Sequence, residues 1–118
     1  MIYHNPPAEL PSLTENEGVF LSIKVLAHLA DMYTNGDDAT NPLAWPYYAT
    51  AADLEGLPPF VVSVNECDPL RDEGIAFGRK LSEAGNDVCT VNVLGTPHAG
   101  TCKPLKLTRP SLHAARCD

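Results

Sequence analysis

The stretch VNECDPLRDEG, residues 64–74, decides how the fold of this sequence is interpreted. It joins the apolar run FVVSV, residues 60–64, to a charged segment over residues 69–84 whose apolar residues have helical spacing. A continuous β-branched run of this kind is typical of a parallel strand that is covered on both faces. Asp68 therefore follows a predicted strand and precedes a predicted helix.

A second strand is predicted after this helix, over residues 87–94. In DVCTVNVL, apolar residues and Cys89 alternate with polar ones, so one face is expected to be wetter, as near a sheet edge. Strand, helix and strand form a βαβ unit, in which the two strands are parallel. Because two strands do not make a stable sheet, the sequence predicts an α/β fold that is one portion of a larger sheet with a flanking helix.

A further helix is predicted upstream, over residues 17–33. It follows TENE, residues 14–17, which has the form of a capping box, and its apolar residues fall on one wide face. Residues 36–59 are rich in turn-forming residues, and the proline-rich residues 1–13 are expected to be irregular.

Length and composition restrict the class of protein. The 118 residues are enough for one domain at most, and an apolar fraction of 44% with 19% charged residues fits a globular protein. The net charge of −7 argues against a nucleic-acid partner, which requires clustered Lys and Arg. No apolar run approaches the roughly 20 residues of a membrane span, and no signal peptide follows Met1, so a cytoplasmic protein is expected.

The four cysteines, Cys67, Cys89, Cys102 and Cys117, match no zinc-binding spacing. In the absence of a secretory signal they are expected to be free thiols. Cys67 and Cys89 fall in predicted strands, where a buried cysteine acts as a small apolar residue.

The charge balance changes near residue 100. Residues 1–100 contain four basic and fourteen acidic residues, whereas residues 101–118 contain four basic residues and one acidic residue. We therefore expect residues 1–100 to form the α/β portion and residues 101–118 to be an atypical basic tail. A reading-frame change or cloning artefact near Thr101 is one hypothesis, which a comparison of the encoding DNA in all three frames would test.

A histidine follows the second predicted strand as Asp68 follows the first. It is His98, in GTPHAG, residues 95–100. Because the carboxyl ends of adjacent parallel strands meet at one edge of a sheet, the two side chains can come together. A carboxylate fixes the tautomer of an imidazole and stabilises its cation, as a serine or cysteine hydrolase requires. Alternatives remain, since Asp68 followed by Pro69 also suits a helix N-cap, and a lone His in a loop is commonly a surface residue.

At these residues the sequence resembles a known family. LEGLPPFVVSVNECDPLRDEG, then a helix, then GTPHAG, is similar to the C-terminal part of the hormone-sensitive-lipase-like esterases, which have the α/β-hydrolase fold. The resemblance covers roughly residues 40–100, with a looser match through LPSLTENEGVFLS, residues 10–22. It implies hydrolysis of a small ester without a cofactor, with Asp68 as the acid and His98 as the general base of a catalytic triad. The cap and triad interpretations of Asp68 are compatible, because it has two carboxylate oxygens.

The nucleophile that this family uses is not found in the 118 residues. Its Gly-x-Ser-x-Gly and His-Gly-Gly motifs are missing, and Ser63, inside a predicted strand, is expected to be structural. We therefore expect the serine to lie upstream of Met1, and the chain to be incomplete and inactive alone as an esterase or lipase. The alternative is a truncated or non-catalytic interaction piece. A flavodoxin-like binder has no Gly-rich phosphate loop to support it.

Two further expectations concern the substrate and the partners. Trp45 and Tyr47 could line a substrate pocket, although aromatic residues in such a loop more commonly serve packing. Exposed sheet edges promote strand pairing with another chain. Association with a segment that carries the serine is therefore expected, or a homodimer, which the resemblance implies through residues 87–94.

Overall fold

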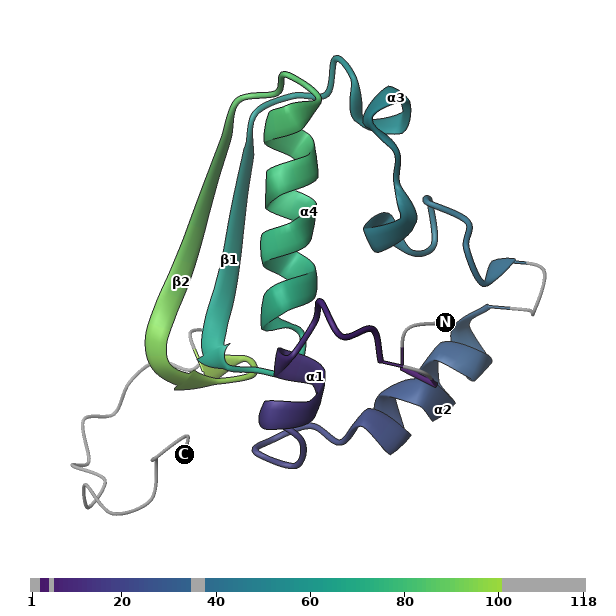
Figure 1. Ribbon diagram of the computed structural model, residues 1–118, viewed down its shortest axis with the longest axis vertical. Coiled ribbons are helices and arrows are strands. Elements are labelled where there is room, and N and C mark those ends of the chain that lie inside the picture. Colours follow the sequence, from purple (N-terminus) through teal and green to yellow (C-terminus); the bar gives the residue numbers. More distant parts are fainter. Residues whose placement is uncertain (1–2, 5, 35–37, 101–118) are drawn as a thin grey trace.

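The computed structural model describes residues 3–4, 6–34 and 38–100. Its centre is a parallel pair of strands, β1 (Phe60–Cys67) and β2 (Val88–Pro97), joined by helix α4 (Arg71–Glu83) (Figure 1). The predicted βαβ unit is confirmed. Both strands extend three residues beyond their predicted carboxyl ends, because the chain stays extended up to the turns at Asp68 and His98.

The pairing of the two strands is irregular near their carboxyl ends. The register is regular up to Asn65 opposite Val93, and then Cys67 lies opposite Pro97. β2 thus contains two more residues than β1 between these pairs. Gly95, with a φ of +68°, provides the left-handed backbone that this irregularity requires.

Helix α4 covers one face of the sheet (Figure 1). Leu81 is completely buried there, in a core with Ala49 and Leu54 that also includes Phe60 and Phe77. The prediction that both faces of the first strand are covered is wrong for the described part of the chain, where the Val61 side chain on the opposite face is 75% exposed. A β-branched run therefore indicated the strand but not the burial of both faces.

The N-terminal segments form a second apolar cluster against α4. Leu10 and Leu13 are buried, and aromatic residues from the N-terminal segment and from the loop before β1 pack around them. Leu13 belongs to the short helix α1 (Ser12–Glu15). This cluster fixes α1 beside the start of α4.

The predicted start of the upstream helix is wrong. Helix α2 (Ile23–Tyr33) begins six residues later than expected, and Thr14 lies inside α1, where its hydroxyl donates to Pro11 O instead of capping. Gly18, with a φ of +77°, separates the two helices. Glu17 instead accepts the backbone N–H of Ile23 at 2.7 Å, so this carboxylate stabilises the start of α2.

The described part of the turn-rich segment before β1 includes two short helices. They are the 3₁₀ helix η2 (Pro46–Tyr48) and helix α3 (Ala51–Leu54). A capping box forms here, between Thr50 and Asp53, rather than at TENE. The loop is therefore ordered by local hydrogen bonds as well as by packing against α4.

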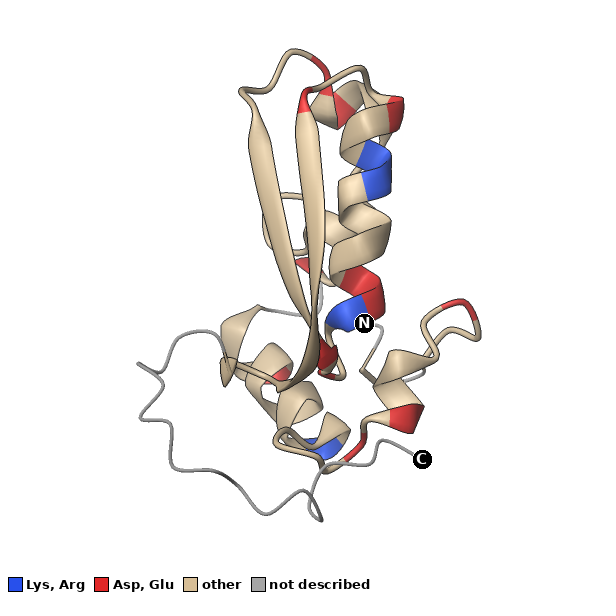
Figure 2. Ribbon diagram, turned by 90° about the vertical axis from the view of Figure 1, so that its left-hand side faces the viewer, with Lys and Arg blue, Asp and Glu red and all other residues tan. Residues whose placement is uncertain are grey.

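Charged residues are unevenly placed on this framework. Figure 2 shows the Lys and Arg positions of the described residues on α2 and α4, with acidic residues at both ends of α4. None of the helices among residues 3–100 that the structure describes is long and apolar enough to cross a membrane. The proposed tail, residues 101–118, lies outside the described residues.

The expectation of free thiols is wrong for Cys67, which is disulfide-bonded, and right for Cys89. Spacing along the chain could not predict this, because disulfide formation depends on the approach of two Cβ atoms in space. Cys89 is also exposed rather than buried, since β2 lies at the sheet edge in the described part of the molecule. Cys102 and Cys117 lie outside the described residues.

Candidate active site

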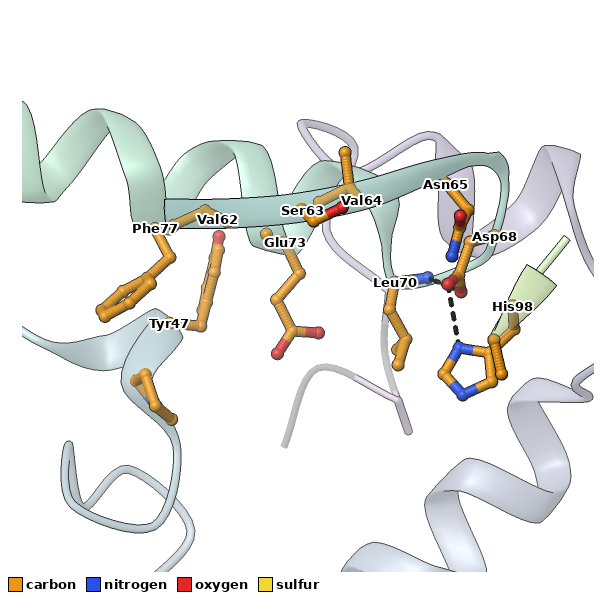
Figure 3. Close-up of a pocket in the computed structure, with 13 residues that line it drawn as sticks. Tyr47, Val62, Ser63, Val64, Asn65, Asp68, Leu70, Glu73, Phe77 and His98 are labelled. Carbon is orange, nitrogen blue, oxygen red and sulfur yellow. Dashed lines mark hydrogen bonds and ion pairs between the residues drawn. The ribbon is translucent and has the colours of Figure 1, made fainter. Parts of the chain in front are cut away.

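The structure brings Asp68 and His98 together at the carboxyl end of the sheet. Each residue directly follows one member of the last strand pair, Cys67 opposite Pro97. The Nδ1 atom of His98 lies 2.8 Å from Asp68 Oδ2 (Figure 3). Because an ionised carboxylate only accepts hydrogen bonds, Nδ1 must be the donor, which leaves Nε2 as the acceptor of a neutral imidazole.

The second oxygen of Asp68 makes a local contact. Oδ1 accepts the backbone N–H of Leu70 at 2.9 Å, two residues along the chain, as in an Asx turn. The N-cap position of α4 is Leu70 itself, so Asp68 stabilises the turn before the helix rather than the helix cap. The N-cap interpretation of Asp68 is therefore wrong, although its carboxylate does hold the turn between β1 and α4.

The two side chains differ in exposure. Asp68 is 8% exposed, whereas His98 is 35% exposed. The His98 ring stacks beside Phe20, with 6.2 Å between the ring centroids, and its Nε2 atom meets no hydrogen-bond partner among the described residues. Within the described residues, His98 Nε2 therefore remains available as a hydrogen-bond acceptor.

Further contacts fix the loop of His98 against the end of β1. The Thr96 hydroxyl donates to Asn65 Oδ1 at 2.8 Å, and the Gly95 N–H donates to Glu66 Oε2 at 2.6 Å. Ala99, immediately after His98, has a φ of +57°, which is uncommon for a residue with a side chain. The irregular end of β2 is thus held in one geometry, and His98 with it.

A pocket of about 550 Å³ opens beside the pair. Figure 3 shows side chains of β1, α4 and the loop around Tyr47 directed toward it. Most of them are apolar, and Glu73 is the carboxylate that joins Asp68 in the lining. A largely apolar pocket with a few polar groups suits a small organic ligand.

Glu73 was not predicted from the sequence as a site residue. Burial raises the pKa of its carboxyl, while a hydrogen bond from Tyr3, 3.1 Å from Tyr3 Oη to Glu73 Oε2, acts in the opposite direction. Burial and the Glu73 carboxylate likewise raise the pKa of the Tyr3 hydroxyl. A Glu in the first turn of a helix is commonly a solvated charge, so nothing in the sequence distinguished it.

The two aromatic candidates lie in different places. Tyr47 lines the pocket, and Lys80 holds its loop by donating to the carbonyls of Tyr47 and Ala49. Trp45 packs between Tyr3 and Tyr33 in edge-to-face contacts and is not among the lining residues. Substrate binding by Trp45 and Tyr47 stays a prediction.

Ser63 also lines the pocket but makes no hydrogen bond to His98. Among the described residues, no group of three or more His, Cys, Asp or Glu side chains could hold a metal ion. The arrangement that remains is an Asp–His pair at a pocket, which can move a proton at His98 Nε2.

Comparisons with known proteins place this geometry in context. Residues 3–101 match the model of a family described as alpha/beta hydrolase fold. Esterase LipI of Mycobacterium tuberculosis is 40% identical over 77 residues, which are 64% of this chain and 24% of LipI. The arylesterase of Saccharolobus solfataricus is 38% identical over 85 residues, covering 70% of this chain and 27% of the arylesterase.

Solved structures give a similar result. Brefeldin A esterase, described as a bacterial homologue of human hormone-sensitive lipase, superposes with a TM-score of 0.75 at 54% identity. The match covers 76% of this chain and 25% of that protein. The esterase Est22 superposes with a TM-score of 0.68 at 42% identity. The chain thus spans about a quarter of the length of the relatives that it matches.

Proposed function

The chain belongs to the α/β-hydrolase fold family, among the hormone-sensitive-lipase-like esterases, and we propose that it supplies the acid and the base of a serine carboxylic-ester hydrolase. The predicted fold class and family are thereby confirmed. The observation that carries the proposal is the 2.8 Å contact between His98 Nδ1 and Asp68 Oδ2, with Nε2 open. The substrate is a small ester, which the pocket beside the pair would hold.

In this mechanism His98 Nε2 takes the proton of a serine hydroxyl as the serine attacks the ester carbonyl. Asp68 holds the imidazole in the reactive tautomer and stabilises the cation that forms. The imidazolium then gives its proton to the leaving alcohol. In the second half of the cycle, His98 takes a proton from water as the water attacks the acyl-enzyme. It then returns this proton to the serine oxygen, which leaves as the carboxylic acid is released.

The serine of this mechanism comes from a Gly-x-Ser-x-Gly segment outside these 118 residues. None of the five serines of the chain lies in such a motif. Among the described serines, Ser12 and Ser22 use their hydroxyls as donors to Pro69 and Glu17. These 118 residues alone are therefore expected to be inactive, and association with that segment completes the site.

The open edge of β2 supports a second mode of association, a homodimer. In the described part of the molecule β2 pairs only with β1, and it exposes Val91 and Leu94. Unpaired edges of this kind favour pairing with another strand. Light scattering of the purified protein would test the dimer.

Hydrolysis of short-chain p-nitrophenyl esters tests the function. It would be measured with the chain alone and with the chain supplied with a hydrolase segment that carries Gly-x-Ser-x-Gly. We expect turnover only in the second sample, and its loss in His98→Ala. His28→Ala, which alters an exposed residue of α2, is the matched control and should retain activity. A folded chain with no turnover in either sample would favour the non-catalytic alternative.

A further inference from the structure

Two buried polar side chains, one in α1 and one just after it, lie against the segment that carries Asp68. Figure 1 shows α1 at the carboxyl end of β1, beside the first turn of α4. Ser12 is 0% exposed and Asn16, just after the helix, is 2% exposed. Burial of polar groups in this position is costly unless each of their donors and acceptors finds a partner.

Asn16 uses its side-chain amide on two carbonyls of this segment. Its Nδ2 atom lies 3.2 Å from Glu66 O and 3.2 Å from Asp68 O. Both amide hydrogens are thus engaged, one on each side of Cys67. Arg71 Nη1 adds a third donor, at 3.0 Å from Glu66 O.

Ser12 links the start of α1 to the start of α4. Its hydroxyl donates to Pro69 O at 2.8 Å and accepts the backbone N–H of Asp72 at 3.1 Å. In return, the Ser12 N–H donates to Asp72 Oδ2 at 2.7 Å. Each helix thereby satisfies a backbone N–H that the other leaves without an intrahelical acceptor.

Both side chains hold carbonyls at the end of β1 and in the turn that follows it, those of Glu66, Asp68 and Pro69. This is the segment that carries the Asp68 carboxylate toward His98. Thr14, on the same helix, donates only to Pro11 O, within its own turn. We propose that Ser12 and Asn16 are positioning residues for Asp68, an inference that rests on the proposed hydrolase function.

Asn16→Leu and Ser12→Ala test this inference. The first removes the amide donor with little change in side-chain volume, and the second removes the hydroxyl donor and makes the side chain smaller. Thr14→Ala is the matched control on the same helix. The first measurement is the NMR signal of the His98 Nδ1 proton in the complete 118-residue chain, since a proton shared with a carboxylate resonates far downfield. The second is hydrolysis by the two samples described above.

We expect both variants to broaden or lose this proton signal while circular dichroism shows a folded chain, and Thr14→Ala to keep it. When either variant is mixed with the segment that carries Gly-x-Ser-x-Gly, kcat should fall roughly tenfold to a hundredfold with KM little changed. The reason is that misplaced catalytic groups lower the rate of the chemical step. Ser12→Thr retains the hydroxyl and should restore both readouts.

A folded Asn16→Leu or Ser12→Ala chain with an unchanged proton signal and unchanged kcat overturns the inference. If Asn16→Leu does not fold, the inference is tested by comparing the proton signal and kcat of the milder variant Ser12→Ala with those of Ser12→Thr. Asp68→Asn separates this result from a failure of the proposed function. Unchanged hydrolysis in Asp68→Asn, or no hydrolysis in any sample, refutes the function, whereas the proton signal still reports whether α1 positions Asp68.

Discussion

Asp68 holds His98 through one carboxylate oxygen, at 2.8 Å from Oδ2 to Nδ1, and the backbone of Leu70 through the other. The sequence left a choice between a local structural role and a catalytic role for this residue. The geometry is compatible with both roles, because each carboxylate oxygen has its own partner. Variants that remove one function and leave the other can therefore separate them.

Asp68→Asn is expected to abolish hydrolysis while the fold is retained. The amide can still accept the Leu70 N–H through its oxygen, but it offers an N–H to His98 Nδ1 and so favours the wrong tautomer. The loss in kcat should be on the order of 10⁴-fold, as for the equivalent change in serine proteases. Asp68→Ala should lose both contacts, so its melting temperature should fall as well. Equal melting temperatures of the two variants would contradict the structural contribution of Asp68 Oδ1.

The strand ends of the βαβ unit indicated that Asp68 and His98 could meet at one edge of the sheet, and the family resemblance was needed to predict them as a pair. The sequence was not sufficient to predict the start of α2. TENE satisfied a capping-box pattern, but Gly18 allows the chain to turn there, and the Glu17 carboxylate instead accepts the Ile23 N–H.

The surroundings of the pair could not be predicted for a different reason. Asn16 lies 52 residues before Asp68 in the chain, and a Ser or Asn in a short helix or turn has many ordinary local roles. The stacking of Phe20 on His98 likewise depends on how α1 and α2 are folded back on the sheet. Such contacts are tertiary, and no local periodicity encodes them.

Asp72 should make stability depend on pH in the acid range. Burial acts to raise the pKa of its carboxyl, but hydrogen bonds from Arg71 and from Ser12 outweigh this effect and lower it. A lowered pKa in the folded state contributes stability above the ordinary Asp value of about 3.9, which is lost as the pH falls through the folded-state pKa. In urea unfolding, Asp72→Asn should therefore lose less stability than the wild type on acidification below about pH 4.

The control for Asp72 is Glu83→Gln, at the exposed opposite end of α4. This variant should retain the wild-type dependence on pH. An Asp72→Asn curve parallel to that of the wild type at all pH values would contradict the assignment of this dependence to Asp72.

Glu73 should make stability depend on pH in the opposite direction to Asp72. Burial raises the pKa of its carboxyl, so the folded state favours the protonated form. Its contribution to stability is present below the ordinary Glu value of about 4.3 and is lost as the pH rises through the folded-state pKa. Glu73→Gln, which can still accept the Tyr3 hydroxyl, should therefore gain stability relative to the wild type as the pH rises from about 4 to 7. A difference that does not change with pH, or that follows the exposed control Glu55→Gln, would refute this.

Gly74 should be required for the approach of α4 to β1. A Cβ atom at this position would lie 2.5 Å from Val64 Cγ1, and Val64 is buried, with a stiff β-branched side chain. Gly74→Ala should therefore lower the free energy of unfolding by about 1–3 kcal/mol, as overpacked cores do. The double variant Gly74→Ala/Val64→Ala removes the clashing methyl. If the losses in unfolding free energy of the two single variants simply add up in the double variant, the clash with Val64 does not cause the destabilisation by Gly74→Ala.

Lys80 should hold the wall of the pocket that contains Tyr47. Its ammonium group donates to the carbonyls of Tyr47 and Ala49 and lies 5.1 Å from the Tyr47 ring centroid. Lys80→Met keeps the aliphatic packing but removes the charged donor. A hydrogen bond that involves a charged group contributes about 1.5–3 kcal/mol. Amide hydrogen exchange at Tyr48 and Ala49 should then become roughly tenfold faster or more, since about 1.4 kcal/mol of local stability corresponds to a tenfold change. The adjacent exposed variant Arg79→Met should leave this exchange unchanged, and equal effects of the two variants would show that the loop does not depend on Lys80.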